Sequence, residues 1–325
     1  MRNSIIAGTG SYAPCNVVSN DDLSKIMDTN DEWIESRTGI KNRCISTEEN
    51  TSDLAYEAGL KAIKNAGMIA EDINLIIVST ITPDMQMPSV ACMVQKKLGA
   101  VNASAFDVSA ACSGFIYAVD IADSMIRSGR HNNVLVIGAE VLSKSINWSD
   151  RSTAVLFGDG AGAAVLKADE NKNGILYALT AAEGDKGQYL EMEERPVISP
   201  FSNNNGTNIN KFITMDGKQV LRFSTRVIVD AVKEVLEKTN ESIDDIAYII
   251  PHQANYRIID YAAHKLNVDC SKFYLNIRDY GNTSSASIAI ALDEAFRENK
   301  VKKGDKVILV GVGGGLTYGA KLVEI

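Results

Sequence analysis

Two parts of this chain repeat the same arrangement of residues 173 positions apart, and this repeat limits the possible folds more than any other feature. In both parts an amphipathic helical segment is followed by an acidic turn and an apolar strand, at residues 71–77 and again at 244–250. A second pair of apolar strands, at residues 134–138 and 307–311, keeps the same spacing. Self-similarity of this kind indicates a duplicated supersecondary unit. The sequence therefore predicts an α/β protein built from two β-α-β halves.

The two predicted halves comprise residues 1–170 and 171–325. Between its two strands each half has a loop followed by a helix, and these segments begin near Cys112 and Asn282. If the halves face each other, these two residues lie at equivalent positions near the interface, where ligand sites are common. The polar stretch of residues 186–217 has no counterpart in the first half, so we expect it to form a surface loop.

Cys112 lies where an apolar strand changes into a helix. The apolar run ends at Val108, small residues follow, and a helical pattern extends from Cys112 to about Ser128. Ser109 is a candidate N-cap, which would place Cys112 in the first turn, where the helix dipole stabilises a thiolate. The small neighbours leave room for a bulky group to reach the sulfur. On this stretch alone, a nucleophile and a buried core cysteine are equally good interpretations.

A histidine and an asparagine in the second half could assist such a nucleophile. His252 directly follows the apolar strand at residues 247–250, and α/β proteins often place catalytic groups just beyond the carboxyl end of a strand. Asn282 precedes a predicted helix, where an asparagine also serves simply as a cap. The sequence therefore offers a possible Cys, His and Asn site assembled from both halves.

Two glycine-rich stretches add to this picture. Residues 154–166 predict a β-hairpin with glycines at its turn. Residues 311–315 resemble a phosphate-binding loop, but a strand-like tail follows them instead of a helix, which argues against a dinucleotide site. Backbone N–H groups in such a run can instead hold an oxyanion.

The composition argues against several classes of protein. The formal net charge is −8, which disfavours nucleic acid as a partner, and no apolar run is long enough to span a membrane. The apolar segment at the start of the sequence is too short for a signal peptide. The 5 cysteines are scattered without a CxxC pair, so we expect a cytoplasmic protein with neither a disulfide framework nor a metal site.

Taken together, the motifs resemble those of β-ketoacyl-acyl carrier protein synthase III, the priming condensing enzyme of type II fatty acid synthesis in the thiolase-like superfamily. The resemblance extends over nearly the whole chain. It rests on residues 31–34, 37–40, 107–115, 157–162, 251–255, 281–284 and 313–315. It implies a thiolase-like fold in which the duplicated β-α-β halves pack as a layered αβαβα core.

The resemblance also implies a mechanism. Cys112, His252 and Asn282 fall on the catalytic triad of the family, and the N–H groups of Cys112 and Gly314 would hold the oxyanion. The cysteine would take an acyl group from an acyl-CoA primer. His252 and Asn282 would then stabilise the enolate formed when malonyl-acyl carrier protein loses CO2, and the product would be 3-oxoacyl-acyl carrier protein. No metal and no tightly bound cofactor is implied, because coenzyme A enters as the thioester substrate.

Further residues receive binding roles by the same resemblance. Trp33 and Arg151 would flank the adenine of coenzyme A, Arg37 would help at the nucleotide end, and Asn255 would contact the pantetheine arm. A positive patch would dock the acidic acyl carrier protein, and it would comprise Arg222, Arg257 and Lys265. The family also forms homodimers.

This sequence departs from the family at two positions near the expected acyl group. Met87 and Val312 stand where members commonly have Phe, so we expect a primer longer or more branched than acetyl. Two other functions remain open at this point. One is a specialised condensing enzyme or acyltransferase of secondary metabolism with the same triad, and the other is a silent subunit that binds acyl groups or the carrier protein. The silent subunit would be expected to lose the nucleophile, whereas Cys112 is present.

Overall fold

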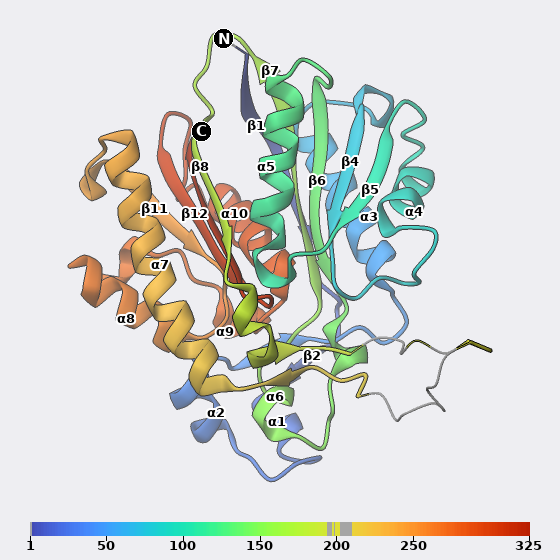
Figure 1. Ribbon diagram of the computed structural model, residues 1–325, viewed down its shortest axis with the longest axis vertical. Coiled ribbons are helices and arrows are strands. Elements are labelled where there is room, and N and C mark those ends of the chain that lie inside the picture. Colours follow the sequence, from blue (N-terminus) through green and yellow to red (C-terminus); the bar gives the residue numbers. More distant parts are fainter. Residues whose placement is uncertain (1, 194–196, 198, 202–209) are drawn as a thin grey trace.

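The computed structural model describes residues 2–193, 197, 199–201 and 210–325, and it contains two main β-sheets (Figure 1). The first half builds a five-stranded sheet in the order β1-β7-β6-β4-β5. Strand β4 is parallel to both of its neighbours, because Leu75 pairs with Ser104 of β5 and with Val134 of β6. The elements of this half are β1 (Asn3–Tyr12), α3 (Thr51–Asn65), β4 (Leu75–Ser79), α4 (Val90–Leu98), β5 (Ser104–Val108), α5 (Gly114–Arg127), β6 (Asn133–Glu140) and β7 (Gly160–Asp169).

The second half repeats this plan with a four-stranded sheet in the order β11-β12-β13-β8. The repeat predicted from the sequence is confirmed, since β6 and β12 begin 173 residues apart at Asn133 and Lys306. An isolated parallel bridge from Ile249 to Phe273 stands where the first half has β5. The elements are β8 (Ile175–Ala182), α7 (Gly217–Thr239), β11 (Ile246–Pro251), α8 (Tyr256–Leu266), α10 (Ser287–Arg297), β12 (Lys306–Gly313) and β13 (Thr317–Glu324).

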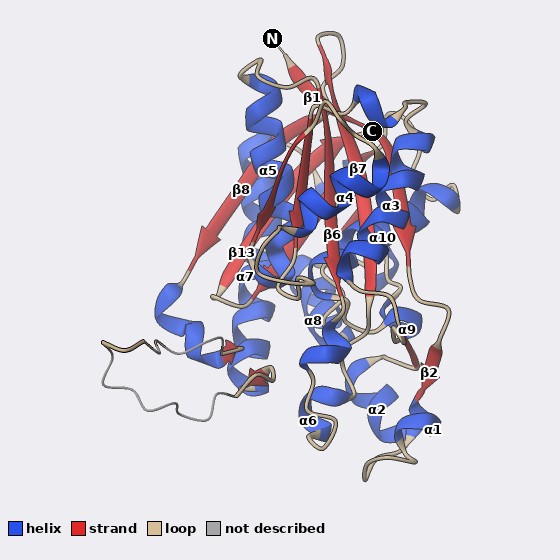
Figure 2. Ribbon diagram, turned by 90° about the vertical axis from the view of Figure 1, so that its right-hand side faces the viewer, coloured by secondary structure: helices blue, strands red, loops and turns tan. Residues whose placement is uncertain are grey.

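The helices and sheets alternate in five layers, which confirms the predicted thiolase-like αβαβα core. Helices α5 and α10 lie between the two sheets and contact strands of both (Figures 1 and 2). Helices α3 and α4 cover the outer face of the first sheet, and α7 and α8 cover that of the second. The central strands are apolar on both faces, as expected for parallel strands buried between helices. They carry runs such as Ile76-Ile77-Val78 and Ile308-Leu309-Val310, all fully or almost fully buried.

Shorter elements gather at one end of the sheets, below them in Figure 1. A strap near the start of the chain comprises β2 (Val17–Ser19), α1 (Asn20–Leu23), α2 (Asp31–Thr38) and β3 (Asn42–Cys44). It is joined there by α6 (Arg151–Ala154), α9 (Ile277–Tyr280) and the small strand pair β9 (Leu190–Glu191) and β10 (Thr214–Met215). Short 3-10 helices occupy Ala70–Asp72, Ala111–Ser113, Leu142–Ser145, Gly184–Tyr189, Ile243–Asp245, Cys270–Lys272 and Ser284–Ala286. In the described part of the chain, no helix combines the length and the apolar character needed to cross a bilayer.

The hairpin predicted at residues 154–166 is wrong. The residues expected to form its first strand instead form the end of helix α6 and a turn. Phe157 forms a parallel bridge with Asn282 from the other half. The expectation of a surface loop at residues 186–217 holds only in part, because this stretch also contains β9 and β10. The polar run at residues 202–206 lies outside the described residues.

Candidate active site

Cys112 lies in the single 3-10 turn Ala111–Ser113, which joins the end of β5 to the start of α5. Ala111 adopts a left-handed φ of 46°, and this directs the chain sharply from the strand into the helix. Ser113, not Ser109, occupies the N-cap position of α5, and its hydroxyl contacts the Ala110 carbonyl and Thr317 Oγ1 instead of capping the helix. The predicted cap is therefore wrong, although Cys112 still lies beside the N-terminus of α5.

The glycine loop of the second half packs against this turn. A Cβ on Gly313 would lie 2.8 Å from the backbone nitrogens of Cys112 and Ser113, so only glycine allows this close approach. The next residue, Gly314, lines a cavity together with Cys112. The expected partners of an oxyanion are therefore neighbours in space, although they come from opposite halves.

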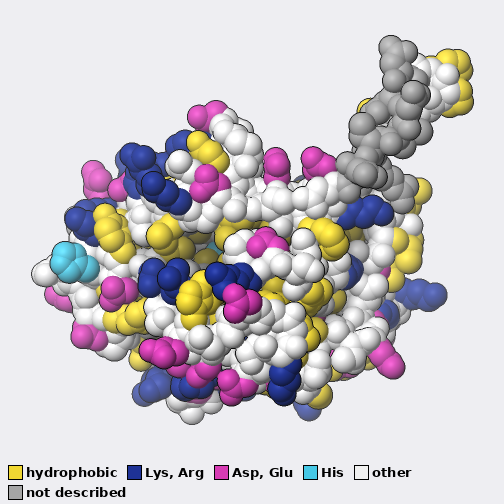
Figure 3. Space-filling model, turned by 90° about the horizontal axis from the view of Figure 1, so that it is seen from below, with side chains coloured by type: hydrophobic (Ala, Val, Ile, Leu, Met, Phe, Trp, Pro, Cys, Tyr) yellow, Lys and Arg dark blue, Asp and Glu magenta, His cyan; other side chains and the backbone are white. Residues whose placement is uncertain are grey.

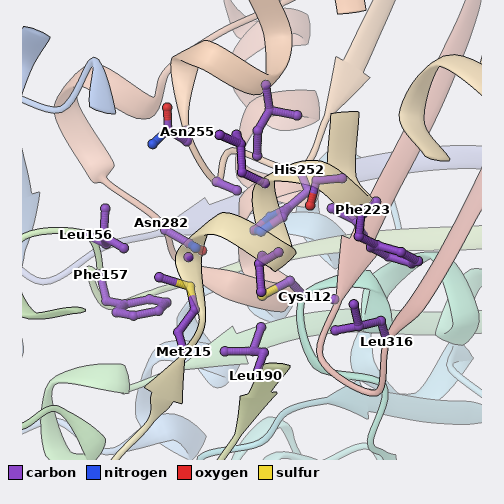
Figure 4. A pocket seen from close by; sticks show the side chains of 18 residues that line it. Cys112, Leu156, Phe157, Leu190, Met215, Phe223, His252, Asn255, Asn282 and Leu316 are labelled. Carbon is purple, nitrogen blue, oxygen red and sulfur yellow. The ribbon is translucent and has the colours of Figure 1, made fainter. Parts of the chain in front are cut away.

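Cys112, His252 and Asn282 all line one cavity, and their side chains point into the same space (Figure 4). They come from three junctions: the end of β5, the end of β11 and the turn between α9 and α10. Each of the three residues is less than 10% exposed, at 7%, 3% and 7% respectively. The rest of the wall is mainly apolar and includes Leu156, Phe157, Leu190, Met215, Phe223, Val312 and Leu316.

The amide of Asn282 is oriented by its own turn. Its Oδ1 accepts the backbone N–H of Ser284 at 2.8 Å, and its backbone bonds with Leu156 and Gly158 of the first half hold the turn in place. Ser284 adopts a left-handed φ of 49° in this turn. Because Oδ1 is occupied, the amide NH2 remains to serve as a donor toward the cavity.

His252 is held at the end of β11 and is neutral. Its backbone N–H donates to the Val310 carbonyl at 2.8 Å, which continues the pairing of β11 with β12. Its Nδ1 lies 2.7 Å from the hydroxyl oxygen of Ser287, the first residue of α10. Burial lowers the pKa of His252 from 6.5 to about 3, because a charged imidazolium would lose its hydration there.

Burial also decides the state of the cysteine. It raises the pKa of the Cys112 thiol to about 12, with a further contribution from the Glu140 carboxylate, while a hydrogen bond with Ser284 acts in the opposite direction. Burial therefore favours the thiol form of Cys112 in the free protein, whereas its place beside a helix N-terminus led the sequence analysis to expect a thiolate. The thiol proton has to leave when substrate reacts.

Glu140, at the end of β6, is a buried residue that the sequence analysis missed. It is completely buried, and its carboxylate accepts hydrogen bonds from the Thr80, Thr82 and Ser285 hydroxyls and from the Ile81 N–H. These bonds join the loop after β4 to the turn that follows Asn282. No sequence motif marks this residue, because its donors come from segments far apart in the chain.

A second, larger cavity is also lined by the Cys112 turn. Its lining includes Cys112, Ser284 and Gly314 together with the loop after β4, notably Asp84, Met85 and Gln86. The sulfur therefore lies where two cavities meet. Of the two residues predicted to shape the primer pocket, Val312 lines the first cavity, whereas Met87 is 85% exposed and lines neither cavity within this chain.

The predicted nucleotide-binding residues lie together on the strap. The guanidinium carbons of Arg37 and Arg151 lie 4.7 Å and 5.2 Å from the centre of the Trp33 ring. Arg151 also donates to the Asp28 carbonyl at 2.7 Å. These cation–π contacts form a site with one aromatic and two basic groups. Asn255 caps helix α8 and lines the first cavity together with the three catalytic candidates.

The three residues of the predicted docking patch are all exposed. Arg222 lies on α7, and Arg257 and Lys265 lie on α8. Arg257 donates to the Ser36 carbonyl at 3.3 Å, and this bond ties α8 to the strap. On the face seen in Figure 3, Lys and Arg side chains and Asp and Glu side chains are interspersed around apolar surface. Among the described residues, no group of three His, Cys, Asp or Glu side chains is arranged to hold a metal ion.

Comparisons with known proteins identify the family. The family model described as 3-oxoacyl-[acyl-carrier-protein (ACP)] synthase III matches residues 106–184, and the model of its C terminal matches residues 236–325. A β-ketoacyl-[acyl-carrier-protein] synthase III of Clostridium perfringens is 52% identical over 326 residues, covering 100% of both chains.

Solved structures extend the agreement to three dimensions. The crystal structure of 3-oxoacyl-[acyl-carrier-protein] synthase III from Aquifex aeolicus has a TM-score of 0.93 and 48% identity, covering 99% of this chain and 100% of the other. A priming β-ketosynthase from the R1128 polyketide biosynthetic pathway has a TM-score of 0.92 and 36% identity, covering 99% and 96%. The identity over the full length, together with the matching fold, shows that this chain belongs to the β-ketoacyl-acyl carrier protein synthase III family.

Proposed function

We propose that this protein catalyses the decarboxylating Claisen condensation of an acyl-CoA primer with malonyl-acyl carrier protein, the step that initiates fatty acid biosynthesis. The observation that carries the proposal is the shared cavity of Cys112, His252 and Asn282, in which a buried thiol faces a neutral imidazole and an amide. Such a site provides a nucleophile and two uncharged hydrogen-bond donors in surroundings of low polarity.

In the first half-reaction, Cys112 attacks the thioester carbonyl of the acyl-CoA. The new S–C bond forms as the bond to the coenzyme A sulfur breaks, and the proton lost by Cys112 ends on the released coenzyme A thiol. The backbone N–H groups of Cys112 and Gly314 would stabilise the oxyanion of the tetrahedral intermediate. This transfer of the acyl group and the proton requires no metal and no redox cofactor.

In the second half-reaction, malonyl-acyl carrier protein occupies the first cavity with its thioester oxygen facing His252 and Asn282. Loss of CO2 leaves the electron pair as an enolate on that oxygen, and the two donors stabilise it. The enolate carbon then attacks the acyl-cysteine and displaces the cysteine as a thiolate, which releases 3-oxoacyl-acyl carrier protein. One proton taken up from solvent returns the cysteine to its thiol form. Both donors interact with negative charge that develops in the transition state. Interactions that are stronger there than in the ground state increase the rate.

We place the nucleotide end of coenzyme A at the strap. The Trp33 ring offers a stacking surface for adenine, and Arg37 and Arg151 offer charge for phosphate groups. Both guanidinium groups lie over this ring in the free chain, so binding of adenine would displace at least one of them. Asn255, on the wall of the cavity, would contact the pantetheine arm that leads to Cys112.

The experiment that tests the function is release of labelled CO2 from malonyl-acyl carrier protein, measured with and without an acyl-CoA. A condensing enzyme gives CO2 and 3-oxoacyl-acyl carrier protein in equal amounts, and both depend on the primer. A silent subunit would give neither product. A specialised enzyme of secondary metabolism, an alternative favoured by the likeness to the R1128 priming ketosynthase, would condense with its own carrier protein in preference to that of fatty acid synthesis.

Docking of the carrier protein can be tested at Arg257. The whole chain has a net charge of −8, so an acidic partner needs a local positive surface, which we propose is formed by Arg222, Arg257 and Lys265. We expect Arg257→Glu to raise KM for malonyl-acyl carrier protein roughly tenfold, equivalent to about 1.4 kcal/mol. Acylation by acyl-CoA should change little.

The matched control is Arg130→Glu, which makes the same charge change beyond the far end of α5. Steady-state kinetics with malonyl-acyl carrier protein and single-turnover acylation would be measured for both variants. Equal loss of both half-reactions in Arg257→Glu, or an equal rise in KM in Arg130→Glu, would contradict the docking role.

We further propose that the protein is a cytoplasmic homodimer in which Met87 reaches the partner's acyl pocket. Strand β5 lies at the edge of its sheet, where no strand among the described residues pairs with its outer side, and the loop after β4 leaves Met85 and Met87 exposed. Unpaired edge strands and exposed apolar side chains are typical of association surfaces. The second cavity, beside Cys112, is partly lined by this same loop.

The expected primer follows from Met87 and Val312. Methionine adapts its shape, and valine is smaller than the usual phenylalanine, so we expect butyryl-CoA or isobutyryl-CoA to be used better than acetyl-CoA. One methylene is worth roughly 1–3 kcal/mol in an apolar pocket, or about 10- to 200-fold in kcat/KM. Met87→Phe and Val312→Phe should each shift kcat/KM back toward acetyl-CoA. A native enzyme that strongly prefers acetyl-CoA would overturn this expectation and leave the triad unaffected.

A further inference from the structure

We propose that Glu140 accepts the thiol proton of Cys112 through the hydroxyl of Ser284 when Cys112 attacks the acyl-CoA, and gives it back when coenzyme A leaves. Cys112, Ser284 and Glu140 then form a proton relay. The inference rests on the proposed function, because it assigns the route of the proton in the first half-reaction. The relay is separate from His252 and Asn282, which act on the malonyl group.

The three side chains form a continuous series of contacts between the two halves of the chain. Cys112 is hydrogen-bonded to Ser284, and both residues line the second cavity. Ser284 Oγ lies 3.3 Å from Glu140 Oε1. The 3-10 turn that carries Cys112 packs against the 3-10 turn that carries Ser284, so backbone from both halves fixes these contacts. Ser284 and Glu140 are 1% and 0% exposed, which keeps the proton acceptor away from bulk water.

One oxygen of Glu140 is fully occupied by hydrogen-bond donors. Thr80 Oγ1 accepts the Thr82 N–H at 3.1 Å, and Thr82 Oγ1 accepts the Val141 N–H at 3.0 Å. Each of these hydroxyls donates its own proton to Glu140 Oε2, at 3.1 Å and 2.6 Å. The Ile81 N–H donates to the same oxygen at 3.1 Å. An oxygen that accepts three hydrogen bonds has no room for a proton, so a proton on this carboxyl has to lie on Oε1.

The other oxygen, Oε1, is placed to be satisfied with or without a proton. Ser285 Oγ lies 2.8 Å from Oε1 and 2.9 Å from the Ser79 carbonyl oxygen. A hydroxyl has one proton and two acceptor sites, so Ser285 donates to Oε1 when the carboxyl is ionised. When Oε1 carries a proton, Ser285 turns its own proton to Ser79 and accepts the one from Glu140. Both states therefore keep the hydrogen bonds that a buried carboxyl requires.

Proton transfer within this site avoids the cost that keeps Cys112 protonated. Burial raises the pKa of both Cys112 and Glu140, because a charge on either group loses its hydration. Loss of the thiol proton to water would add a second negative charge beside the carboxylate. Transfer to Glu140 instead moves one charge to the sulfur and leaves the net charge unchanged. The raised pKa also makes Glu140 a stronger base than an exposed carboxylate.

The step balances as two proton transfers in each direction. While the S–C bond forms, the thiol proton moves to Ser284 Oγ and the hydroxyl proton of Ser284 moves to Glu140 Oε1. In the tetrahedral intermediate both sulfurs are bonded to the same carbon, so the hydroxyl beside Cys112 is also close to the coenzyme A sulfur. When the bond to that sulfur breaks, the protons return along the same path and the departing sulfur takes one. Glu140 is then a carboxylate again, beside acyl-cysteine.

The first test compares two buried carboxylates in single-turnover acylation by acetyl-CoA or butyryl-CoA, followed by intact-protein mass spectrometry. Glu140→Gln keeps the shape of the side chain but cannot take the proton, so we expect acylation to slow by about 100-fold. The matched control is Asp159→Asn. Asp159 is also 0% exposed and accepts the Ser143 hydroxyl at 2.6 Å, but it lines neither cavity. Asp159→Asn should be acylated at nearly the native rate.

A second variant separates the relay from a purely structural role of Glu140. Ser284→Ala interrupts the relay and leaves the carboxylate in place, so acylation should slow as in Glu140→Gln. It keeps the backbone N–H that orients Asn282 Oδ1. The malonyl step of the pre-acylated enzyme should therefore stay near the native rate in both variants. Equal slowing of both half-reactions would show that Glu140 only holds the Asn282 turn, and would contradict the relay.

Solvent deuterium tests the relay in the native protein and does not depend on a variant that folds. Because two protons move together, we expect the acylation rate to fall along a curve as the fraction of deuterium rises, and along a straight line in Ser284→Ala. A straight line, or no change, in the native protein would overturn the relay. A native protein that forms no acyl adduct would reject the proposed function as well. A native adduct that forms equally fast in Glu140→Gln would reject the relay alone.

Discussion

Replacing Cys112 with alanine is expected to abolish the covalent acyl adduct that forms when the protein is incubated with an acyl-CoA. The sulfur is the nucleophile of the first half-reaction, and neither the imidazole nor the amide in the cavity can replace it. Intact-protein mass spectrometry without any malonyl donor would measure the adduct directly. We expect one acyl group on each native chain and none on Cys112→Ala.

Cys44 provides a matched control. It is also buried, at 6% exposure, and burial raises the pKa of its thiol to about 11. Both thiols therefore lie in surroundings of low polarity. It lines neither of the two cavities described above. Cys44→Ala should therefore keep the full adduct. An adduct that persists in Cys112→Ala, or is lost in Cys44→Ala, would show that the nucleophile has been misassigned.

The pH dependence of thiol reactivity reports the protonation state of Cys112 in the free enzyme, before substrate binds. Because the pKa of Cys112 is raised to about 12, the thiolate fraction of the free protein increases about tenfold for each pH unit between 7 and 9. In the proposed mechanism, acylation at neutral pH depends on events that follow substrate binding, namely oxyanion stabilisation and transfer of the thiol proton to the leaving group. The low pKa of His252 points the same way, because an imidazole with a pKa of about 3 is a poor base.

The internal repeat predicts the fold well because duplicated strands keep both their spacing and their apolar character. The starts of β6 and β12 keep the predicted spacing, and the alternation of helices and sheets follows from strands that are apolar on both faces. The turns at Cys112 and Asn282 occupy corresponding places between the repeated strands, although their spacing differs from that of the strands by about three residues. Local sequence was therefore enough to bring two members of the site together, and the motif at His252 supplied the third.

Features that depend on contacts between distant segments were not predictable. The hairpin expected at residues 154–166 fails because Phe157 pairs with Asn282 instead of with the strand that follows it. Glu140 is marked by no motif, since its hydrogen-bond donors come from loops about 60 and 145 residues away. The protonation of Cys112 also depends on burial, which the amphipathic pattern alone does not measure.

Removal of either hydrogen-bond donor is expected to damage decarboxylation far more than acylation. Loss of one donor to a developing oxyanion typically costs about 100- to 1,000-fold in rate, so His252→Ala and Asn282→Ala should each lower the rate of CO2 release by this amount. Asn282→Asp keeps the shape of the side chain and removes its NH2, so it should be at least as damaging as Asn282→Ala. Labelled CO2 release and acyl transfer would be measured on the same preparations.

The comparison between the two half-reactions is what tests the mechanism. If His252 only donates, acylation of Cys112 in His252→Ala should remain within about tenfold of the native rate, because the coenzyme A sulfur receives the thiol proton. If His252 is instead the base for Cys112, acylation and decarboxylation should fall together by about the same factor. The double variant should lose little more than either single one if the two donors hold the same oxygen as a unit, since groups that act together are not additive. An Asn282→Asp variant with native CO2 release would show that the amide does not donate to the enolate, and the fixed orientation of its Oδ1 toward the Ser284 N–H would then serve only the turn.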